Sequence, residues 1–312
     1  MMFLLLGGLL VLFYLLGLSA DLVIINTKRI GQKLGLNLFF LGLILGFFTS
    51  LPEMAVAINS LINNVPNLSV GNLWGSFFVL FGLILGASVL LNRQISTDGR
   101  VWSILPIFFL LLLPMLLALD NQLNLIEGLM IITLYFAITL YLIVKNIQLR
   151  GKILPEPKNK IIKNIFLIFL GLVLVIILSH FIISITLYLL SIFNIPEFII
   201  GLILFSVGTN LPEITMAIKS WQNRVRELSF SNLFGSAMVN TLIIGIMAIF
   251  RPLLINVDIN FVYMFCSLLI LFLCLLFFYR SNKSITKNEG LILIFIYLIF
   301  LLGQVFITLF HQ

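Results

Sequence analysis

The chain has 312 residues, of which 62% are hydrophobic and only 9% are charged, and its formal net charge is +7. A soluble globular protein carries about 25% charged residues, so this composition excludes a soluble fold and predicts a polytopic membrane protein. The basic residues fall in short connections between apolar runs, which argues against a nucleic-acid-binding surface.

Apolar runs of about 20 residues, the length of one membrane crossing, follow one another along the chain. The first run lacks a basic start and a small-residue cleavage site, which favours a retained span over a cleaved signal peptide. The predicted fold class is an all-α polytopic membrane protein with ten transmembrane helices. The expected spans are residues 2–26, 36–58, 69–92, 101–119, 124–146, 162–192, 197–218, 228–250, 256–279 and 288–309.

The basic residues also orient the predicted helices. If the N-terminus lies outside and the chain crosses ten times, every Lys and Arg except Arg251 falls in an inner loop. This distribution follows the positive-inside rule. We therefore expect a multi-pass protein of the cell inner (plasma) membrane with both the N- and C-termini outside. Its expected partners are membrane lipid and inorganic cations, with no nucleic acid and no obligatory protein partner evident.

A polar motif occurs twice, 160 residues apart, inside two apolar runs. Residues 49–53 read TSLPE and residues 209–213 read TNLPE, and each is followed by a second match, NLWGS at 72–76 and NLFGS at 232–236. Each half holds five predicted spans, an odd number, so the second copy enters the membrane from the opposite side. The sequence thus predicts two inverted five-helix repeats, an architecture common in secondary transporters. The predicted repeats are residues 1–147 and 164–312, joined by a cytoplasmic linker at 148–163.

The two prolines of the motif, Pro52 and Pro212, are expected to break their helices. Proline has no N–H, and its ring crowds the carbonyl four residues earlier. The expected breaks lie at residues 48–52 and 208–212. Irregular backbone at membrane depth is tolerated only where it is buried in protein or lines a cavity, so the freed carbonyls are expected to face a site.

The polar groups beside these breaks are expected to form an all-oxygen cluster. Carboxylates inside a membrane usually mark an ion pathway. Carboxylate, carbonyl and hydroxyl oxygens suit a hard cation, and Ca²⁺ takes six to eight such ligands. The side chains expected to converge are Glu53, Glu213, Thr49 and Thr209.

In these motifs the chain resembles the cation/Ca²⁺ exchanger superfamily, most like its prokaryotic sodium/calcium exchangers. The resemblance covers essentially the whole chain. It implies an antiporter, not an enzyme, that exchanges Ca²⁺ for Na⁺ by alternating access and carries no cofactor. It also implies that Glu53, Glu213, Thr49 and Thr209 hold the metal. The flanking positions that it associates with Na⁺ or with helix contacts are Ser50, Asn210, Ser76 and Ser236. Asn240 is a further candidate for such a secondary role.

Five positions depart from the family pattern. Four residues after the motif serine, where the family usually has a polar residue, the chain has Leu80 in the first copy. In the second copy it has Asn240, which is neutral where many relatives have aspartate. Phe77 and Ala237 replace the usual asparagine after each serine, and Phe48 replaces a glycine before the first threonine. These departures leave the coupling ion, the stoichiometry and the choice among divalent cations open.

Three alternatives remain beside Na⁺/Ca²⁺ exchange. They are an antiporter coupled to H⁺ or carrying another divalent ion, a degenerate relative that does not transport, and an intramembrane metalloenzyme. The last finds little support, since the chain has no HExxH motif and only two histidines. Of the remaining polar residues, we expect an interfacial carboxylate at Asp21 and a helix–helix hydrogen bond at His180. Acids expected at the outer ends of spans are Asp120, Glu127, Glu197 and Asp258.

Overall fold

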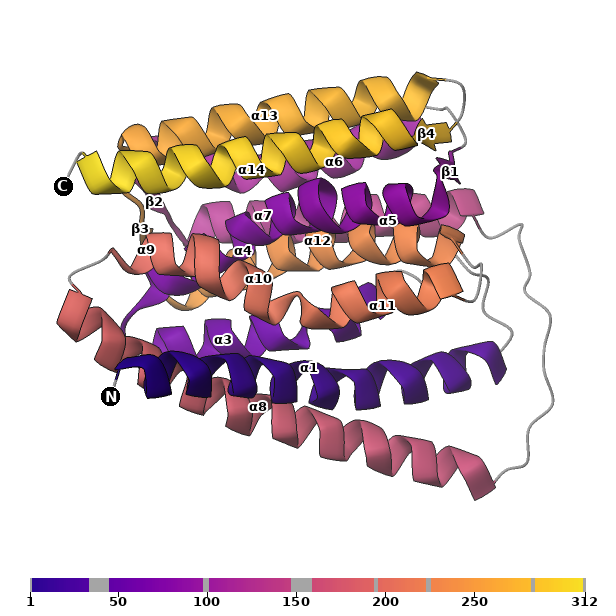
Figure 1. Ribbon diagram of the computed structural model, residues 1–312, viewed down its shortest axis with the longest axis horizontal. Helices are drawn as coiled ribbons and strands as arrows, with labels where there is room; N and C mark the ends of the chain where they lie inside the picture. The colour runs from indigo at the N-terminus through magenta and orange to yellow at the C-terminus, as the bar shows by residue number, and fades with distance from the viewer. Residues whose placement is uncertain are drawn as a thin grey trace.

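Long helices that run side by side make up nearly all of the structure (Figure 1). The computed structural model describes residues 2–33, 45–97, 101–146, 159–193, 196–222, 226–281 and 284–310. Within these ranges the all-helical prediction is confirmed. Residues 34–44, at the start of the second predicted span, and 147–158, most of the predicted linker, lie outside the described residues.

The first half of the chain begins with one long helix and continues with shorter, interrupted ones. Residues 45–49 are helical, and α4, η1 and α5 follow one another without a loop. The helices of this half are α1 (Met2–Lys33), α3 (Leu51–Ile62), α4 (Pro66–Phe78), η1 (Val79–Ile84), α5 (Leu85–Asn92), α6 (Val101–Leu117), η2 (Ala118–Asp120) and α7 (Leu125–Asn146).

The second half also begins with one long helix, and α8 already starts within the predicted linker. The helical segment that follows, residues 197–222, is interrupted at Asn210, as the segment 45–62 of the first half is at Ser50. The helices of this half are α8 (Asn159–Phe193), α9 (Glu197–Ile200), η3 (Gly201–Phe205), α10 (Ser206–Thr209), α11 (Leu211–Gln222), α12 (Arg226–Phe250), α13 (Ile259–Arg280) and α14 (Lys287–Phe310).

Eight helices in the described ranges are long and apolar enough to cross a membrane. Two further apolar helices, Leu51–Ile62 and Ile104–Asp120, are shorter. The polytopic class is therefore supported, while the count of ten spans stays a prediction. The eight candidates are Leu5–Val23, Pro66–Asn92, Leu125–Val144, Ile162–Thr186, Glu197–Ile214, Ser231–Phe250, Ile259–Arg280 and Lys287–Leu309.

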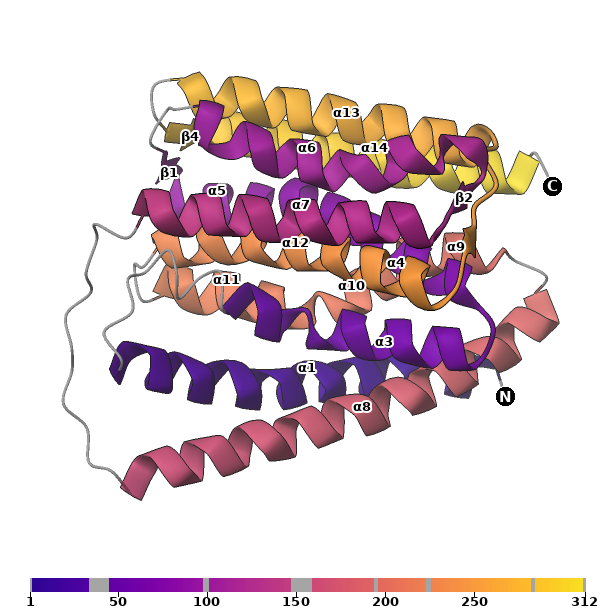
Figure 2. The same ribbon diagram turned by 180° about the vertical axis from the view of Figure 1, so that it is seen from behind.

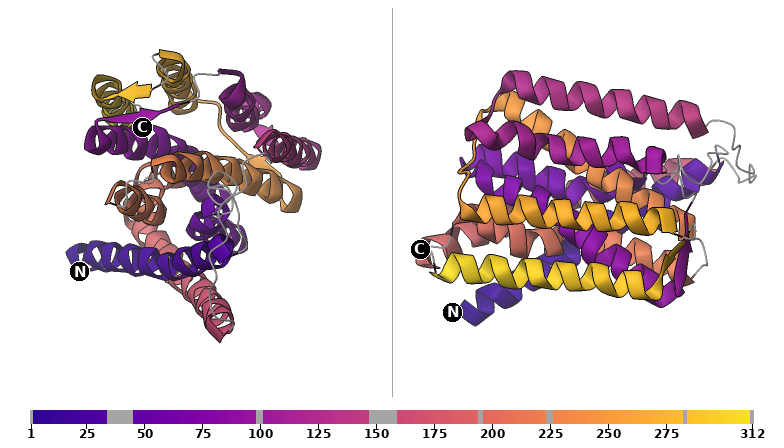
Figure 3. Two further views of the ribbon diagram at one scale, coloured as in Figure 1. Left: turned by 90° about the vertical axis from the view of Figure 1, so that its right-hand side faces the viewer. Right: turned by 90° about the horizontal axis from the view of Figure 1, so that it is seen from above.

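The helices pack in layers. Helices α1 and α8 lie against each other at one edge, and α13 and α14 lie at the opposite edge (Figure 3). Between these edges, α4 contacts η3 and α10, while α12 contacts α7 and α11, an arrangement visible from behind in Figure 2. The two interrupted segments, 45–62 and 197–222, both pack against α4 and α12.

Two short antiparallel strand pairs, which hydropathy gave no reason to expect, join loops at opposite ends of the bundle (Figure 1). At one end β1 (Gln94–Ser96) pairs with β4 (Ser284–Thr286). At the other end β2 (Gln122–Leu123) pairs with β3 (Leu253–Leu254). Each pair links the first half to the second. Helix α1 starts and α14 ends at the β2–β3 end.

Two apolar clusters flank the interrupted segments. The larger centres on buried aromatic rings, with Phe108 stacked on Phe272 at 4.5 Å between ring centroids. The smaller joins α1 and α8 to α3, and includes Phe13 packed edge-on against Phe205 at 5.4 Å. Because α3 contributes residues to both clusters, its polar motif is enclosed between them.

Candidate functional site

The two proline motifs interrupt their helices with nearly the same backbone geometry. Ser50 has φ −83° and ψ 11°, and Asn210 has φ −83° and ψ 13°. Helix α3 begins directly after Ser50, and α10 ends directly before Asn210. The helices are thus interrupted for one residue each, at Ser50 and at Asn210, within the expected ranges 48–52 and 208–212. Without a proline N–H, the carbonyls of Phe48 and Gly208 lose their usual helical partners.

The carboxylates of the motif are enclosed in the protein. Glu53 is 0% exposed and Glu213 is 1% exposed. In the described part of the chain they are the only acidic or basic side chains that are fully buried. Two like charges without a buried basic partner are costly in a low-dielectric interior. A bound cation would neutralise them.

A hydrogen-bonded chain connects one motif to the other at Ser236. The Ser236 hydroxyl lies 2.7 Å from the Thr49 hydroxyl and 2.9 Å from Glu213 Oε1. Since a serine hydroxyl has one proton, we assign Ser236 as donor to the carboxylate. The Thr49 proton is then shared between Ser236 and the Gly46 carbonyl, which lies 3.1 Å from the Thr49 hydroxyl. Ser50 is close by and donates to the Gly46 carbonyl at 3.0 Å. The first motif thus meets the serine of the second half.

The converse pairing holds on the other side. The Thr209 hydroxyl lies 3.1 Å from Asn72 Oδ1, and Asn210 Nδ2 donates to the Ser76 hydroxyl at 2.8 Å. Asn210 Nδ2 also donates to the Ser206 carbonyl, which fixes the orientation of the amide. The second motif therefore meets the serine of the first half, so that the two halves are paired crosswise.

Several oxygens in this cluster accept no hydrogen bond from the described residues. They are both oxygens of Glu53, Glu213 Oε2 and Asn210 Oδ1. Asn240, one helical turn after Ser236 on α12, has neither amide atom paired with a described residue. Free carboxylate and amide oxygens are the donors that hard cations prefer, so the available groups fit a divalent cation.

Close helix crossings hold these groups together. A Cβ added to Gly46 would lie 2.6 Å from the backbone of Gly235 and Ser236. A Cβ on Gly75 would lie 2.8 Å from Ser206 Cβ and would also strike the Leu202 carbonyl oxygen. Only glycine lets these backbones approach so closely, as small residues commonly do at membrane helix contacts.

Some features of the site were not found by sequence reasoning. Asn72 and Asn232 were recognised as repeated, but no role was assigned to either, although both are buried and Asn72 holds Thr209. The wide π-helical turns η1 and η3, which lie beside the motif residues, were also missed. Segments of this kind are frequent at functional sites. The repeat of Asn72 at an equal spacing was the available signal.

The departures from the family pattern have distinct surroundings. Leu80 lies in η1, is fully buried and belongs to the larger apolar cluster together with Phe77. Asn240 lies in α12 and is buried with an unpaired amide. Phe48 belongs to the rim of the smaller cluster, while Gly208 packs under the ring of Phe13. At this pair of corresponding positions, therefore, only the second half presents a polar side chain.

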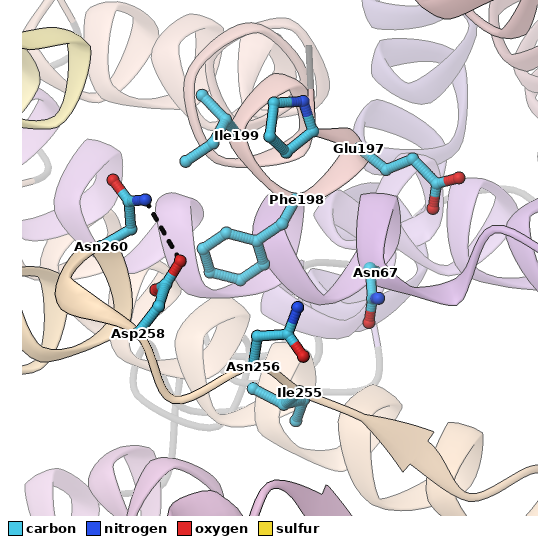
Figure 4. Close-up of a pocket in the computed structure, with 9 residues that line it drawn as sticks. Asn67, Glu197, Phe198, Ile199, Ile255, Asn256, Asp258 and Asn260 are labelled. Carbon is cyan, nitrogen blue, oxygen red and sulfur yellow. Dashed lines mark hydrogen bonds between the residues drawn. The ribbon is translucent and has the colours of Figure 1, made fainter. Parts of the chain in front are cut away.

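The remaining polar residues lie elsewhere. The predicted helix–helix bond of His180 is confirmed, since its Nδ1 lies 3.1 Å from Asn59 Oδ1 and thus ties α8 to α3. Glu197 and Asp258 line a pocket of about 330 Å³ at the β2–β3 end of the bundle (Figure 4). Asp258 also caps α13 by accepting a bond from the Phe261 N–H at 2.9 Å. None of the motif residues lines this pocket.

The comparisons with known proteins agree with this architecture. The family described as Sodium/calcium exchanger protein matches residues 4–144 and 163–306. The sodium/calcium exchanger MaX1 of Methanosarcina acetivorans is 24% identical, with 93% of this chain and 97% of that protein covered. The putative antiporter CaxA of Alkalimonas amylolytica is 26% identical, with 91% and 94% covered. A structure of the sodium-calcium exchanger NCX_Mj superposes with a TM-score of 0.71 at 20% identity, covering 95% of this chain and 97% of that one.

Proposed function

This chain belongs to the sodium/calcium exchanger protein family, and we propose that it is a secondary antiporter that exchanges Ca²⁺ for Na⁺ by alternating access. The observation that carries the proposal is the pair of buried carboxylates, Glu53 and Glu213, with free oxygens and no buried basic partner in the described residues. Two carboxylates balance the charge of one divalent cation. The proposed activity is therefore transport and not catalysis.

In the proposed site, the cation lies between Glu53 and Glu213. Thr49 and Thr209 complete the metal site through hydroxyl or carbonyl oxygens, and Ca²⁺ accepts such mixed oxygen sets. Pro52 and Pro212 open the backbone beside them. The residues proposed for neighbouring ion sites or helix contacts are Ser50, Asn210, Ser76, Ser236 and Asn240.

We propose that the chain forms two inverted five-helix repeats with ten spans. The crosswise contacts support this arrangement, because residues that correspond at a shift of 160 make corresponding contacts. Gly46 faces Gly235, and Ser206 faces Gly75. A two-fold relation between the halves accounts for both contacts, and repeats related in this way place the substrate site at their interface.

The same charges give a physical reason for exchange instead of leak. When the cation leaves, two carboxylates remain in a low-dielectric interior and repel each other. Rearrangement of the empty, doubly negative site across the membrane is unfavourable, so other cations must enter before the protein changes conformation. This requirement couples the two ion movements.

The distribution of basic residues among the loops supports a proposed orientation in the membrane. We propose a plasma-membrane location with the N- and C-termini outside, with membrane lipid and inorganic cations as partners and without a cofactor. The β1–β4 end, where Arg93 and Arg280 flank the strands, would then face inward.

A second candidate differs in the coupling ion. Leu80 is apolar where the family usually has a polar residue, and Asn240 is neutral where many relatives have aspartate, so Na⁺ loses an expected ligand at the first position and an expected charge at the second. Coupling to H⁺, or transport of another divalent cation, is the alternative that these two residues favour.

The test is ⁴⁵Ca²⁺ uptake into proteoliposomes loaded with Na⁺, compared across Na⁺, K⁺ and pH gradients. The expected result is uptake driven by the outward Na⁺ gradient and lost in Glu53→Gln and Glu213→Gln. Uptake that needs no gradient, or that survives both substitutions, would rule out the proposed antiporter. Uptake driven by pH alone would select the H⁺-coupled alternative.

A further inference from the structure

We propose that Asn72 and Asn232 are positioning residues that hold the two motif threonines alternately during transport. In the present structure Asn72 holds Thr209, and in the state on the other side of the conformational change Asn232 holds Thr49 instead. The proposal rests on the antiport function above and deepens it, because it gives two further residues of the same site a part in the movement.

Each motif threonine meets a helix that offers two polar partners. On α4 these are Asn72 and Ser76, and on α12 they are Asn232 and Ser236, at the same four-residue spacing. Residues four apart lie on one face of a helix, one turn from each other. A threonine at either crossing therefore has an asparagine and a serine as alternative partners.

The two halves use these partners differently. The Thr209 hydroxyl lies 3.1 Å from Asn72 Oδ1, whereas the Thr49 hydroxyl lies 2.7 Å from the Ser236 hydroxyl. Asn232, which corresponds to Asn72, is 1% exposed, and neither of its amide atoms bonds to another described residue. A buried amide without partners is costly and calls for an explanation. A second state in which Asn232 accepts the bond from Thr49 supplies one.

The serines and carboxylates follow the same asymmetry. Ser236, bonded to the facing threonine, donates to Glu213 at 2.9 Å, whereas Ser76 donates to the Asn72 carbonyl of its own helix at 2.8 Å. Both oxygens of Glu53 accept no bond from the described residues. Inverted repeats alternate access by moving against each other, so an interchange of the two bonding patterns accompanies that movement. The carboxylate without hydrogen bonds then changes from Glu53 to Glu213.

The experiment measures the Ca²⁺ concentration that gives half-maximal exchange at each face of the membrane. The assay is exchange of ⁴⁵Ca²⁺ for unlabelled Ca²⁺ in oriented proteoliposomes, which does not depend on the coupling ion. The variants are Asn72→Leu and Asn232→Leu, which replace the amide with an apolar group of similar size. The first removes a bond of the present state and the second a bond of the other state. We expect the ratio of the outer to the inner value to shift roughly three- to tenfold, in opposite directions in the two variants.

Two comparisons sharpen the test. The double variant is expected to return the ratio to near the wild-type value, because both states lose one bond. Ser69→Ala is the matched control, since Ser69 is buried on α4 and its hydroxyl bonds to none of the described residues. We expect it to leave the ratio unchanged. If a leucine variant does not fold, serine at the same position replaces it, because serine is smaller and too short to restore the bond.

A merely structural role of the asparagines would lower stability without moving the ratio in opposite directions. An unchanged ratio, a shift of the same sign in both variants or a shift in only one would overturn the proposal. Each of these results would leave the antiporter assignment standing. Absence of Ca²⁺ exchange by the wild type under every condition would overturn that assignment, and this proposal with it.

Discussion

Gly46 lies at a close crossing between the two halves beside the first motif, and its replacement by alanine tests that arrangement. The added Cβ would lie 2.6 Å from the carbonyl carbon of Gly235 and the amide nitrogen of Ser236. Both are backbone atoms, so no side-chain rotation relieves the contact. Tight but tolerable contacts begin at 3.0 Å and ordinary ones at 3.4 Å, so the backbones must separate by about 0.4–0.8 Å.

The expected cost follows from this displacement. Overpacking of a close-packed interior typically costs about 1–3 kcal/mol. The shift also stretches the bonds at Ser236, which now measure 2.7 Å to Thr49 and 2.9 Å to Glu213. Bonds that lengthen to about 3.5 Å cease to orient the carboxylate. We therefore expect Gly46→Ala to lower both the free energy of unfolding and the Ca²⁺ flux.

The matched control is Gly7→Ala in α1, where an added Cβ meets nothing within 4 Å. Both substitutions gain about 1 kcal/mol of helix propensity, so their difference isolates the packing cost. Thermal unfolding in one detergent and ⁴⁵Ca²⁺ flux in one lipid mixture provide the two measurements. If Gly46→Ala matched Gly7→Ala in both, the close contact between the two halves would be refuted.

Three further predictions concern the cation and the hydrogen bonds around it. Ca²⁺ at about 100 times its dissociation constant is expected to raise the free energy of unfolding by about 2.7 kcal/mol. Glu53→Gln is expected to remove most of this gain, and an equal gain in the variant would argue against Glu53 as a ligand. Ser236→Ala removes a donor to a carboxylate, so we expect the apparent Ca²⁺ affinity in flux assays to fall roughly tenfold, since bonds to charged groups contribute about 1.5–3 kcal/mol. Asn59→Ala deletes the bonds from α3 to Ser179 and His180 on α8, and it is expected to cost about 1–2 kcal/mol of stability in chemical unfolding. The control Thr133→Ala removes an exposed bond within its own helix, and it is expected to cost less than about 0.5 kcal/mol.

The predictable part of the site was the part governed by local chemistry. Pro52 and Pro212 must interrupt their helices because they lack an N–H, and this consequence does not depend on the rest of the fold. The burial of Glu53 and Glu213 followed equally from their position inside apolar runs. Hydropathy alone was likewise sufficient for the all-helical class, since a membrane leaves few other ways to satisfy the backbone.

The pairing of side chains could not be derived in the same way. Whether Thr209 meets Asn72 or another neighbour depends on where two helices cross, and the crossing is set by Gly46 and Gly75, whose packing partners lie far away in sequence. The strand pair β1–β4 and the π-helical turns η1 and η3 are also products of tertiary packing. These elements are only three to six residues long, which is too short for a hydrophobic periodicity to reveal them in the sequence.

The crosswise pairing has a consequence for how the two carboxylates act together. Ser236 belongs to the second half but contacts Thr49 of the first, while it also donates to Glu213. Movement of residues 45–49 against α12 therefore alters the bond from Thr49 to the same hydroxyl that donates to Glu213, a carboxylate that lies on neither segment. Asn210 makes the corresponding link from the second half to the first, because its amide donates both to Ser76 on α4 and to a backbone carbonyl of α10. The free oxygens that could hold a cation are thus positioned by the contact between the halves, so a change in that contact alters the site as a unit.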